Sequence, residues 1–209
     1  MRKPLWIGVF LAVLLLEAPA YAGPQEDCAQ ERDLDRRVRA CTTRLHKFPS
    51  DATAYFNRSS AYLSLGEADR AIADATKVTQ IDPGWASAYF NRGLGYAQKE
   101  QHDRAITDFT KAIEINPRDG AAYEARARSH IKTGQADAAL RDAERAVALS
   151  PVGSDALVTR AQINEALGRR AEAIADYRRV LADKPALPAA IEGLRRLGAS
   201  PASALAQPR

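Results

Sequence analysis

Arginine and aspartate recur through this 209-residue sequence at a constant step of 34 residues. Each aspartate follows an arginine by 16 residues, which gives the pairs Arg58 and Asp74, Arg92 and Asp108, Arg126 and Asp142, and Arg160 and Asp176. A guanidinium group can bind a carboxylate through two parallel hydrogen bonds. The rows therefore fit either four structural ion pairs or four arginines that bind an acidic ligand. We expect the structural pairs, because paired rows are the commoner arrangement, and we expect each pair to be partly exposed.

The other groups with reactive potential do not converge. His46, His102 and His130 stand at non-equivalent positions of the repeating pattern, whereas a metal site needs three or four converging ligands. The sequence contains none of the motifs typical of a serine nucleophile elbow, a phosphate-binding loop or a dinucleotide fold. We therefore expect no catalytic site, no metal and no cofactor. An enzyme hidden in the repeats is the least favoured class.

The first 22 residues have the composition of a secretory signal peptide. Two positive residues, Arg2 and Lys3, precede an apolar run, and the Ala-Tyr-Ala motif at 20–22 fits a cleavage site. The apolar run, Leu5 to Leu16, is shorter than the roughly 20 residues of a membrane-spanning helix. We expect an exported protein, periplasmic or secreted, with no membrane span after cleavage. An uncleaved membrane anchor is the alternative.

The chain contains two cysteines, Cys28 and Cys41, both after the expected cleavage point. An even number of cysteines in an exported chain favours a disulfide, because that compartment is oxidising. In the chain-entropy model a disulfide across a loop of this length stabilises the fold by about 3 kcal/mol. Two free thiols are the alternative.

The same 34-residue step holds for other residue types. Prolines keep it throughout, at Pro49, Pro83, Pro117, Pro151 and Pro185. Alanines keep it at Ala71, Ala105, Ala139 and Ala173, whereas the row of Gly66, Gly134 and Gly168 is broken by Glu100. Within each unit, apolar residues recur at helical spacing in two segments that flank the glycine position. The pattern predicts four helical hairpins, because glycine ends the first helix and proline the second.

These units resemble tetratricopeptide (TPR) repeats. The residues of the second unit that carry the resemblance are Tyr89, Gly93, Tyr96, Ala105, Phe109 and Pro117. The resemblance extends from Ala52 to Leu187 and implies an all-α fold, a right-handed α-solenoid of four hairpins at residues 52–85, 86–119, 120–153 and 154–187. The chain departs from the family pattern in its arginine row, where the family has leucine. It departs again at His130 and Asn164, where the family has tyrosine.

Stacked repeats leave an apolar face uncovered at each end, so both ends need caps. Residues 23–50 are expected to form an N-terminal cap, in which a half-repeat helix from Leu34 to Phe48 is held by a disulfide between Cys28 and Cys41. Residues 188–198 have the pattern of an amphipathic capping helix, and 199–209 are expected to be a disordered tail.

In TPR proteins the first helix of each hairpin lines a concave groove, so the resemblance implies a binding surface there. The candidate contacts point away from the hairpin interior, and they are Phe56, Asn57, Ser60, Phe90, Asn91, Leu94, Glu124, Arg128, Ile131, Val158, Thr159 and Gln162. Exposed phenylalanines favour a binding patch, and asparagine side chains suit the backbone of an extended peptide. For Phe56 and Phe90 the alternative is packing between adjacent hairpins.

Composition gives no reason to expect a nucleic-acid partner. The net charge is +4, and the basic residues are spread through every unit rather than gathered in one block. We expect an interaction module or scaffold that binds a peptide or protein partner in the groove. The alternative is a permanently bound assembly or regulatory subunit of an envelope enzyme or secretion complex.

Overall fold

The structure, a computed structural model, describes residues 28, 32–150 and 153–201. Within these ranges the elements are α2 (Leu34–Lys47), α3 (Ala52–Ser64), α4 (Ala68–Ile81), α5 (Ala86–Gln98), α6 (His102–Ile115), α7 (Gly120–Lys132), α8 (Ala136–Leu149), α9 (Ser154–Ala166), α10 (Arg170–Asp183) and α11 (Pro188–Arg196). The expected signal peptide at 1–22 and most of the expected tail lie outside the described residues. None of the helices in the described ranges is long and apolar enough to cross a membrane.

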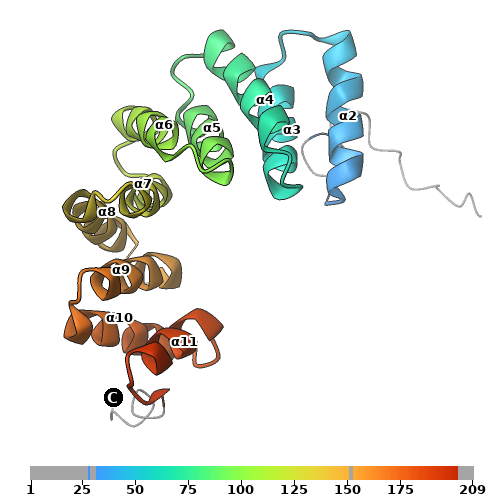
Figure 1. The fold of residues 1–209 in the computed structure, drawn as a ribbon. Coiled ribbons are helices and arrows are strands. Elements are labelled where there is room, and N and C mark those ends of the chain that lie inside the picture. The colour runs from blue at the N-terminus through green and yellow to red at the C-terminus, as the bar shows by residue number, and fades with distance from the viewer. Residues whose placement is uncertain (1–27, 29–31, 151–152, 202–209) are drawn as a thin grey trace, which may run out of the picture.

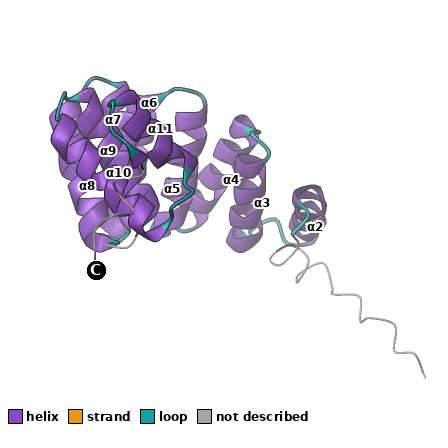
Figure 2. Ribbon diagram, turned by 90° about the horizontal axis from the view of Figure 1, so that it is seen from below, coloured by secondary structure: helices purple, strands orange, loops and turns teal. Residues whose placement is uncertain are grey.

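The helices pack as a row of hairpins. Each of α3, α5, α7 and α9 packs against the helix that follows it and against the helix that precedes it. Figure 1 shows the hairpins following one another along an arc, with α5 and α7 on its inner side and α6 and α8 on its outer side. In Figure 2, in which the described chain is coloured only as helix and loop, α2 lies at one end of the array. The prediction of an all-α solenoid is confirmed.

A left-handed residue makes the turn within each hairpin. Gly66, Gly134 and Gly168 have φ angles of 74°, 76° and 72°, and Glu100 takes the same place in the second hairpin with a φ of 56°. The turn closes in the same way whether glycine or Glu100 stands there. In the first hairpin the backbone N–H of Glu67 donates to the carbonyl of Tyr62 at 2.8 Å, and in the second hairpin Gln101 donates to Tyr96 at 2.9 Å. A side chain in this conformation costs about 1 kcal/mol or more, which the rest of the hairpin offsets.

The arginine row joins both helices of each hairpin. Arg58 donates from Nε and Nη2 to the two carboxylate oxygens of Asp74, at 2.7 and 2.8 Å. The other three arginines make the same two-point contact with their aspartates, at 2.6 to 2.8 Å. Side-chain exposure is 16% for Arg58 and 8% for Asp74, so the pair is more buried than we expected from the sequence. These hydrogen bonds raise the pKa of each arginine in the row.

Three of these arginines also bond a threonine of the helix that precedes their own hairpin. Arg58 donates from Nη1 to Thr42 of α2 at 2.9 Å, and Arg126 donates to Thr110 of α6 at 3.0 Å. Arg92 makes the corresponding bond to Thr79 of α4, at 3.1 Å. The guanidinium groups of the first three arginines also lie 5.3 to 5.7 Å from the ring of the tyrosine three residues before them. Each of these three arginines therefore links its hairpin to the preceding helix, as well as joining the two helices of its own hairpin.

Both ends of the array are covered. At the N-terminal end Cys28 and Cys41 form a disulfide, and these two buried residues pack with Leu45 and Ala54. At the C-terminal end Glu165 accepts hydrogen bonds from Arg196 of α11 at 2.8 and 3.0 Å. Gly193 lies so close to Tyr177 that a Cβ atom would stand 2.3 Å from its ring. Helix α11 can approach α10 this closely only because residue 193 has no side chain.

His130 occupies a place where the family pattern has tyrosine. Its side chain is 11% exposed, its Nδ1 atom is buried without a hydrogen-bond partner among the described residues, and its Nε2 atom lies 3.7 Å from Asp142. Burial lowers the pKa of His130, and the nearby carboxylate of Asp142 opposes this effect only in part. The folded protein therefore favours the neutral imidazole.

We predict that replacing Asp108 by asparagine lowers the free energy of unfolding by about 3 kcal/mol, because Arg92 then keeps a charge with no counter-charge in a largely buried place. The measurement is urea unfolding followed by circular dichroism. Glu114→Gln is the control, because Glu114 pairs with Lys111 on the surface and its loss should cost no more than about 0.5 kcal/mol. Equal effects of the two substitutions would contradict a structural role for the buried row.

We also predict that His130 makes stability fall in weak acid. The histidine pKa is about 6.5 in the unfolded chain, which therefore binds the proton more readily than the folded protein does. The stability that the neutral His130 side chain contributes is complete above that pH and is lost as the pH falls below it. Thermal melts between pH 7.5 and 5.5 should show a smaller loss for His130→Tyr than for the wild type. Substituting the exposed His46 by glutamine should leave the wild-type profile, and an unchanged profile for His130→Tyr would refute the assignment.

Candidate functional site

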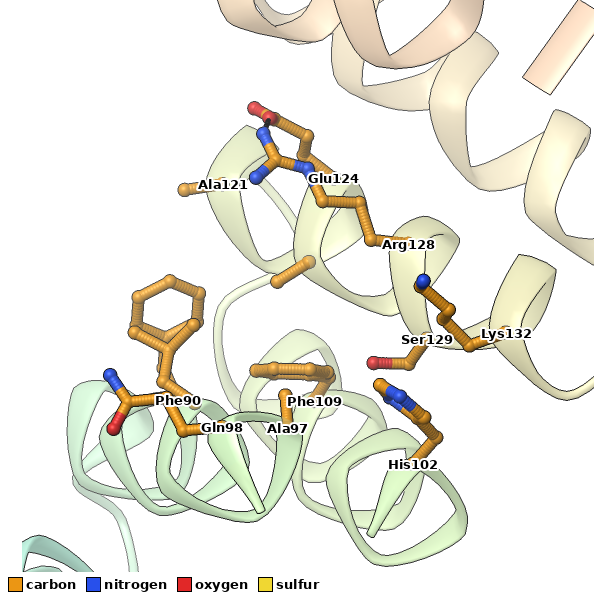
Figure 3. Close-up of a pocket in the computed structure, with 12 residues that line it drawn as sticks. Phe90, Ala97, Gln98, His102, Phe109, Ala121, Glu124, Arg128, Ser129 and Lys132 are labelled. Carbon is orange, nitrogen blue, oxygen red and sulfur yellow. Dashed lines mark hydrogen bonds and ion pairs between the residues drawn. The ribbon is translucent and has the colours of Figure 1, made fainter. Parts of the chain in front are cut away.

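A pocket opens on the inner side of the arc, between the second and third hairpins. Its volume is about 500 Å³, which lies within the range of ligand-binding pockets. The residues that line it come from α5, α6 and α7, and they are Phe90, Leu94, Ala97, Gln98, His102, Phe109, Ala121, Glu124, Ala125, Arg128, Ser129 and Lys132. Figure 3 shows these side chains around the pocket, with α5 and α6 on one side and α7 on the other.

Two phenylalanines form the apolar wall. The rings of Phe90 and Phe109 lie 5.8 Å apart and are tilted by 49°, a geometry that aromatic pairs favour. Phe109 lies on α6, the second helix of its hairpin, and is completely buried. It reaches this place because Gly93 faces it, since a Cβ at residue 93 would lie 2.6 Å from the ring. The glycine that lets the two helices approach thus also brings an aromatic ring to the pocket.

The pocket also contains two polar atoms that lack partners within the described chain. Ser129 is 1% exposed, and its hydroxyl has no hydrogen-bond partner among the described residues. The Nδ1 atom of His102 is likewise buried and unpartnered in this part of the chain. An unsatisfied buried polar group costs about 1–3 kcal/mol and is uncommon in folded proteins. Figure 3 places both side chains on the side of the pocket away from Phe90.

At one edge of the pocket, Glu124 and Arg128 of the lining bond to Thr159 of α9, which is buried and does not line the pocket. Arg128 forms an ion pair with Glu124 and donates from Nε to the hydroxyl of Thr159 at 3.1 Å. Thr159 in turn donates to Glu124 at 3.0 Å, which links α7 to α9. Lys132 is exposed, and within the described residues it makes no ion pair. Within the described residues the rim therefore carries two cations, Arg128 in an ion pair and Lys132 without one.

Four of the predicted groove residues line this pocket, namely Phe90, Leu94, Glu124 and Arg128. Others that the sequence suggested lie elsewhere. Phe56 stacks on Trp85 with a ring separation of 5.3 Å. It therefore packs between adjacent hairpins, which was the alternative to a ligand contact. Asn57 and Ser60 are half-buried, and Gln162 is exposed, without any contribution to the pocket. Ile131 packs against the core of the third hairpin.

Three of the predicted contacts must be corrected because they are buried. Asn91 is 7% exposed and donates from Nδ2 to the hydroxyl of Ser60 at 2.9 Å, so its amide joins α5 to α3 rather than facing a ligand. Val158 is 9% exposed. Helix α9 packs against both α7 and α11, and Val158 belongs to the buried core at this end of the array. Thr159 is buried by the same contacts.

Sequence reasoning missed the residues that make the pocket distinctive. His102 and Phe109 lie on α6, whereas the groove was expected from first helices alone. Ala121 and Ala125 were available as a signal, because they place small side chains where the second hairpin has Ser87 and Asn91. A small residue at a position that is larger in a neighbouring repeat indicates space between hairpins.

The comparisons with known proteins agree on one family. Three family models, each described as a tetratricopeptide repeat, match residues 52–84, 86–119 and 124–188. No curated protein sequence matches the chain.

Many solved structures have this fold. MamA is 23% identical over 73% of this chain and 90% of its own, with a TM-score of 0.66. A thermophilic TPR protein from Thermus thermophilus is 21% identical over 83% of this chain and 91% of its own, with a TM-score of 0.66. The first TPR of Spaghetti (RPAP3), bound to an HSP90 peptide, is 29% identical over 58% of this chain and 94% of its own, with a TM-score of 0.52.

Proposed function

The chain belongs to the tetratricopeptide repeat family, and on that premise we propose that it is a scaffold that binds an extended segment of a partner protein in its concave groove. The observation that carries this proposal is the pocket between the second and third hairpins, with aromatic walls, polar atoms unpartnered within the described chain and a cationic rim. Proteins of this family are typically interaction modules rather than enzymes. The similar repeat of Spaghetti is described with a bound peptide, which supports the same use of the groove here.

The rigidity of the groove supports this function. The walls of the pocket belong to helices that the row of buried arginines fixes to one another, as when Arg92 joins α5 to α6 and α4. Arg126 does the same for α7, α8 and α6. A surface that is already ordered loses little conformational entropy when it binds, so more of the contact energy contributes to affinity. A partner segment would therefore meet a preformed site.

We predict that closing the pocket abolishes partner binding. Ala121 is exposed and lines the pocket, so Ala121→Trp should fill it without disturbing the core. Ala73→Trp is the matched control, because Ala73 is an exposed alanine in the middle of α4 and does not line the pocket. Partners captured by the wild type are identified and purified, and their affinities for the three proteins are measured by biolayer interferometry.

The expected result is a loss of at least about tenfold in affinity for Ala121→Trp, or about 1.4 kcal/mol, and none for the control. Equal affinities for the two tryptophan variants would place partner binding on another face of the solenoid.

We further propose that the protein works outside the cytoplasm, in the periplasm or beyond it. The composition of residues 1–22 supports this, as does a disulfide between Cys28 and Cys41, since such bonds persist in oxidising compartments.

A fusion of residues 1–31 to alkaline phosphatase tests export, because this enzyme is active only where its own disulfides form. We predict activity for the wild-type leader and none when Val13 and Leu15 are both replaced by arginine, which interrupts the apolar run. Mass spectrometry of the native protein should show a chain that begins at Gly23 and lacks free thiols. Recovery of the full-length chain in the cytosol with two reactive thiols would reject the proposal.

A further inference from the structure

We infer that the pocket between the second and third hairpins receives a tyrosine side chain of the partner, next to an acidic residue. This inference rests on the proposed function, because it specifies which residue of the bound segment enters the pocket. It follows from three features of the pocket taken in turn: an apolar wall, a polar end and a cation at the rim.

The apolar wall suits an aromatic ring. Phe90 presents its ring to the pocket, with the buried ring of Phe109 tilted against it, and Leu94, Ala97 and Ala125 complete the apolar lining. A third aromatic ring can pack edge to face or offset against this pair, which adds to the free energy gained by burying its surface. The alanines leave the width for a flat ring. An aliphatic side chain would bury less area against the same wall.

The polar end distinguishes tyrosine from the other aromatic residues. Ser129 and His102 both line the pocket, and the Ser129 hydroxyl and the His102 Nδ1 atom are buried without a hydrogen-bond partner within the described chain. A phenol group can accept a hydrogen bond from the serine hydroxyl and donate one to the imidazole nitrogen. Phenylalanine would leave both atoms unsatisfied, and the indole N–H of tryptophan can only donate. A carboxylate in this place would lose its hydration with a large penalty.

The rim adds a preference for negative charge beside the tyrosine. Arg128 is already held by Glu124 and Thr159, whereas Lys132 has no ion pair in the described part of the chain. An aspartate or glutamate next to the tyrosine would lie within reach of this free ammonium group. Because Lys132 is exposed, its contribution is modest and is screened by salt. The tyrosine supplies the anchor, and the acidic neighbour supplies orientation.

The test uses the chain from residue 23 onward and three fluorescein-labelled peptides, GSDEYDEGS and its versions with phenylalanine or alanine in place of tyrosine. Binding is measured by fluorescence polarisation at low and moderate salt. The tyrosine peptide should bind saturably, and the phenylalanine peptide should bind about tenfold more weakly, because a site built for a hydroxyl group rejects the analogue that lacks it. The alanine peptide should not saturate.

Variants of the polar end give the sharper result. In Ser129→Ala and His102→Leu the difference between the tyrosine and phenylalanine peptides should shrink to about twofold or less, while the melting temperature of Ser129→Ala should not fall, because an unsatisfied polar group is removed. Ser87→Ala is the matched control, since Ser87 is an exposed serine of α5 that does not line the pocket. Lys132→Glu should weaken the tyrosine peptide mainly at low salt.

The inference is overturned if the tyrosine and phenylalanine peptides bind equally, if the preference survives in both polar-end variants, or if the tyrosine peptide fails to saturate by about 1 mM. These outcomes are distinguishable from failure of the proposed function. If Ala121→Trp abolishes partner binding but the peptides do not differ, the groove binds partners without a tyrosine anchor. If the tyrosine peptide binds selectively but Ala121→Trp leaves partner binding intact, the pocket is real and the partner uses another surface.

Discussion

The buried contact between arginine and aspartate is the interaction on which the rest of this solenoid depends. Each guanidinium group bonds the second helix of its own hairpin, and in the first three hairpins it also bonds a threonine of the helix that precedes the hairpin, which is the cap helix α2 for Arg58. A leucine at these positions, as in the family pattern, would fill space without fixing direction. A planar fork bound at both oxygens of Asp74 permits few relative orientations of the helices. In an array held together only by nearest neighbours, that local geometry sets the curvature.

The periodic part of the structure could be predicted from the sequence, since one hairpin buries its apolar faces in the same way as the next. The arginine and aspartate pairs belong to this part, because a 16-residue separation recurs with the hairpin itself. Glu100 interrupted the glycine row in the sequence, yet it adopts a φ of 56° and the turn is unchanged. Packing between the two helices determines that turn more strongly than the preference of one residue does.

What could not be predicted depends on how closely the hairpins approach one another. Asn91 and Val158 occupy positions that the family resemblance assigns to the groove, but both are buried by contacts with neighbouring helices. Burial of this kind depends on which side chains meet between neighbouring hairpins, and no single repeat contains a pattern for that. The pocket arises where the repeats differ, since Phe109 stands where the first and third hairpins have Ala75 and Ala143. Departures from the repeat are therefore more informative about function than the repeat itself.

The short sequence separation of these contacts has a consequence for folding kinetics. Arg58 and Asp74 are 16 residues apart, and one of the longest bonds between hairpins, from Gln98 to the carbonyl of Leu63, spans only 35. Chains whose native contacts are so local close small loops and fold quickly. Structure can begin in any hairpin and spread to the next as each becomes available. A nascent chain, which emerges with its N-terminus first, could thus fold one hairpin at a time, before its last residue is made.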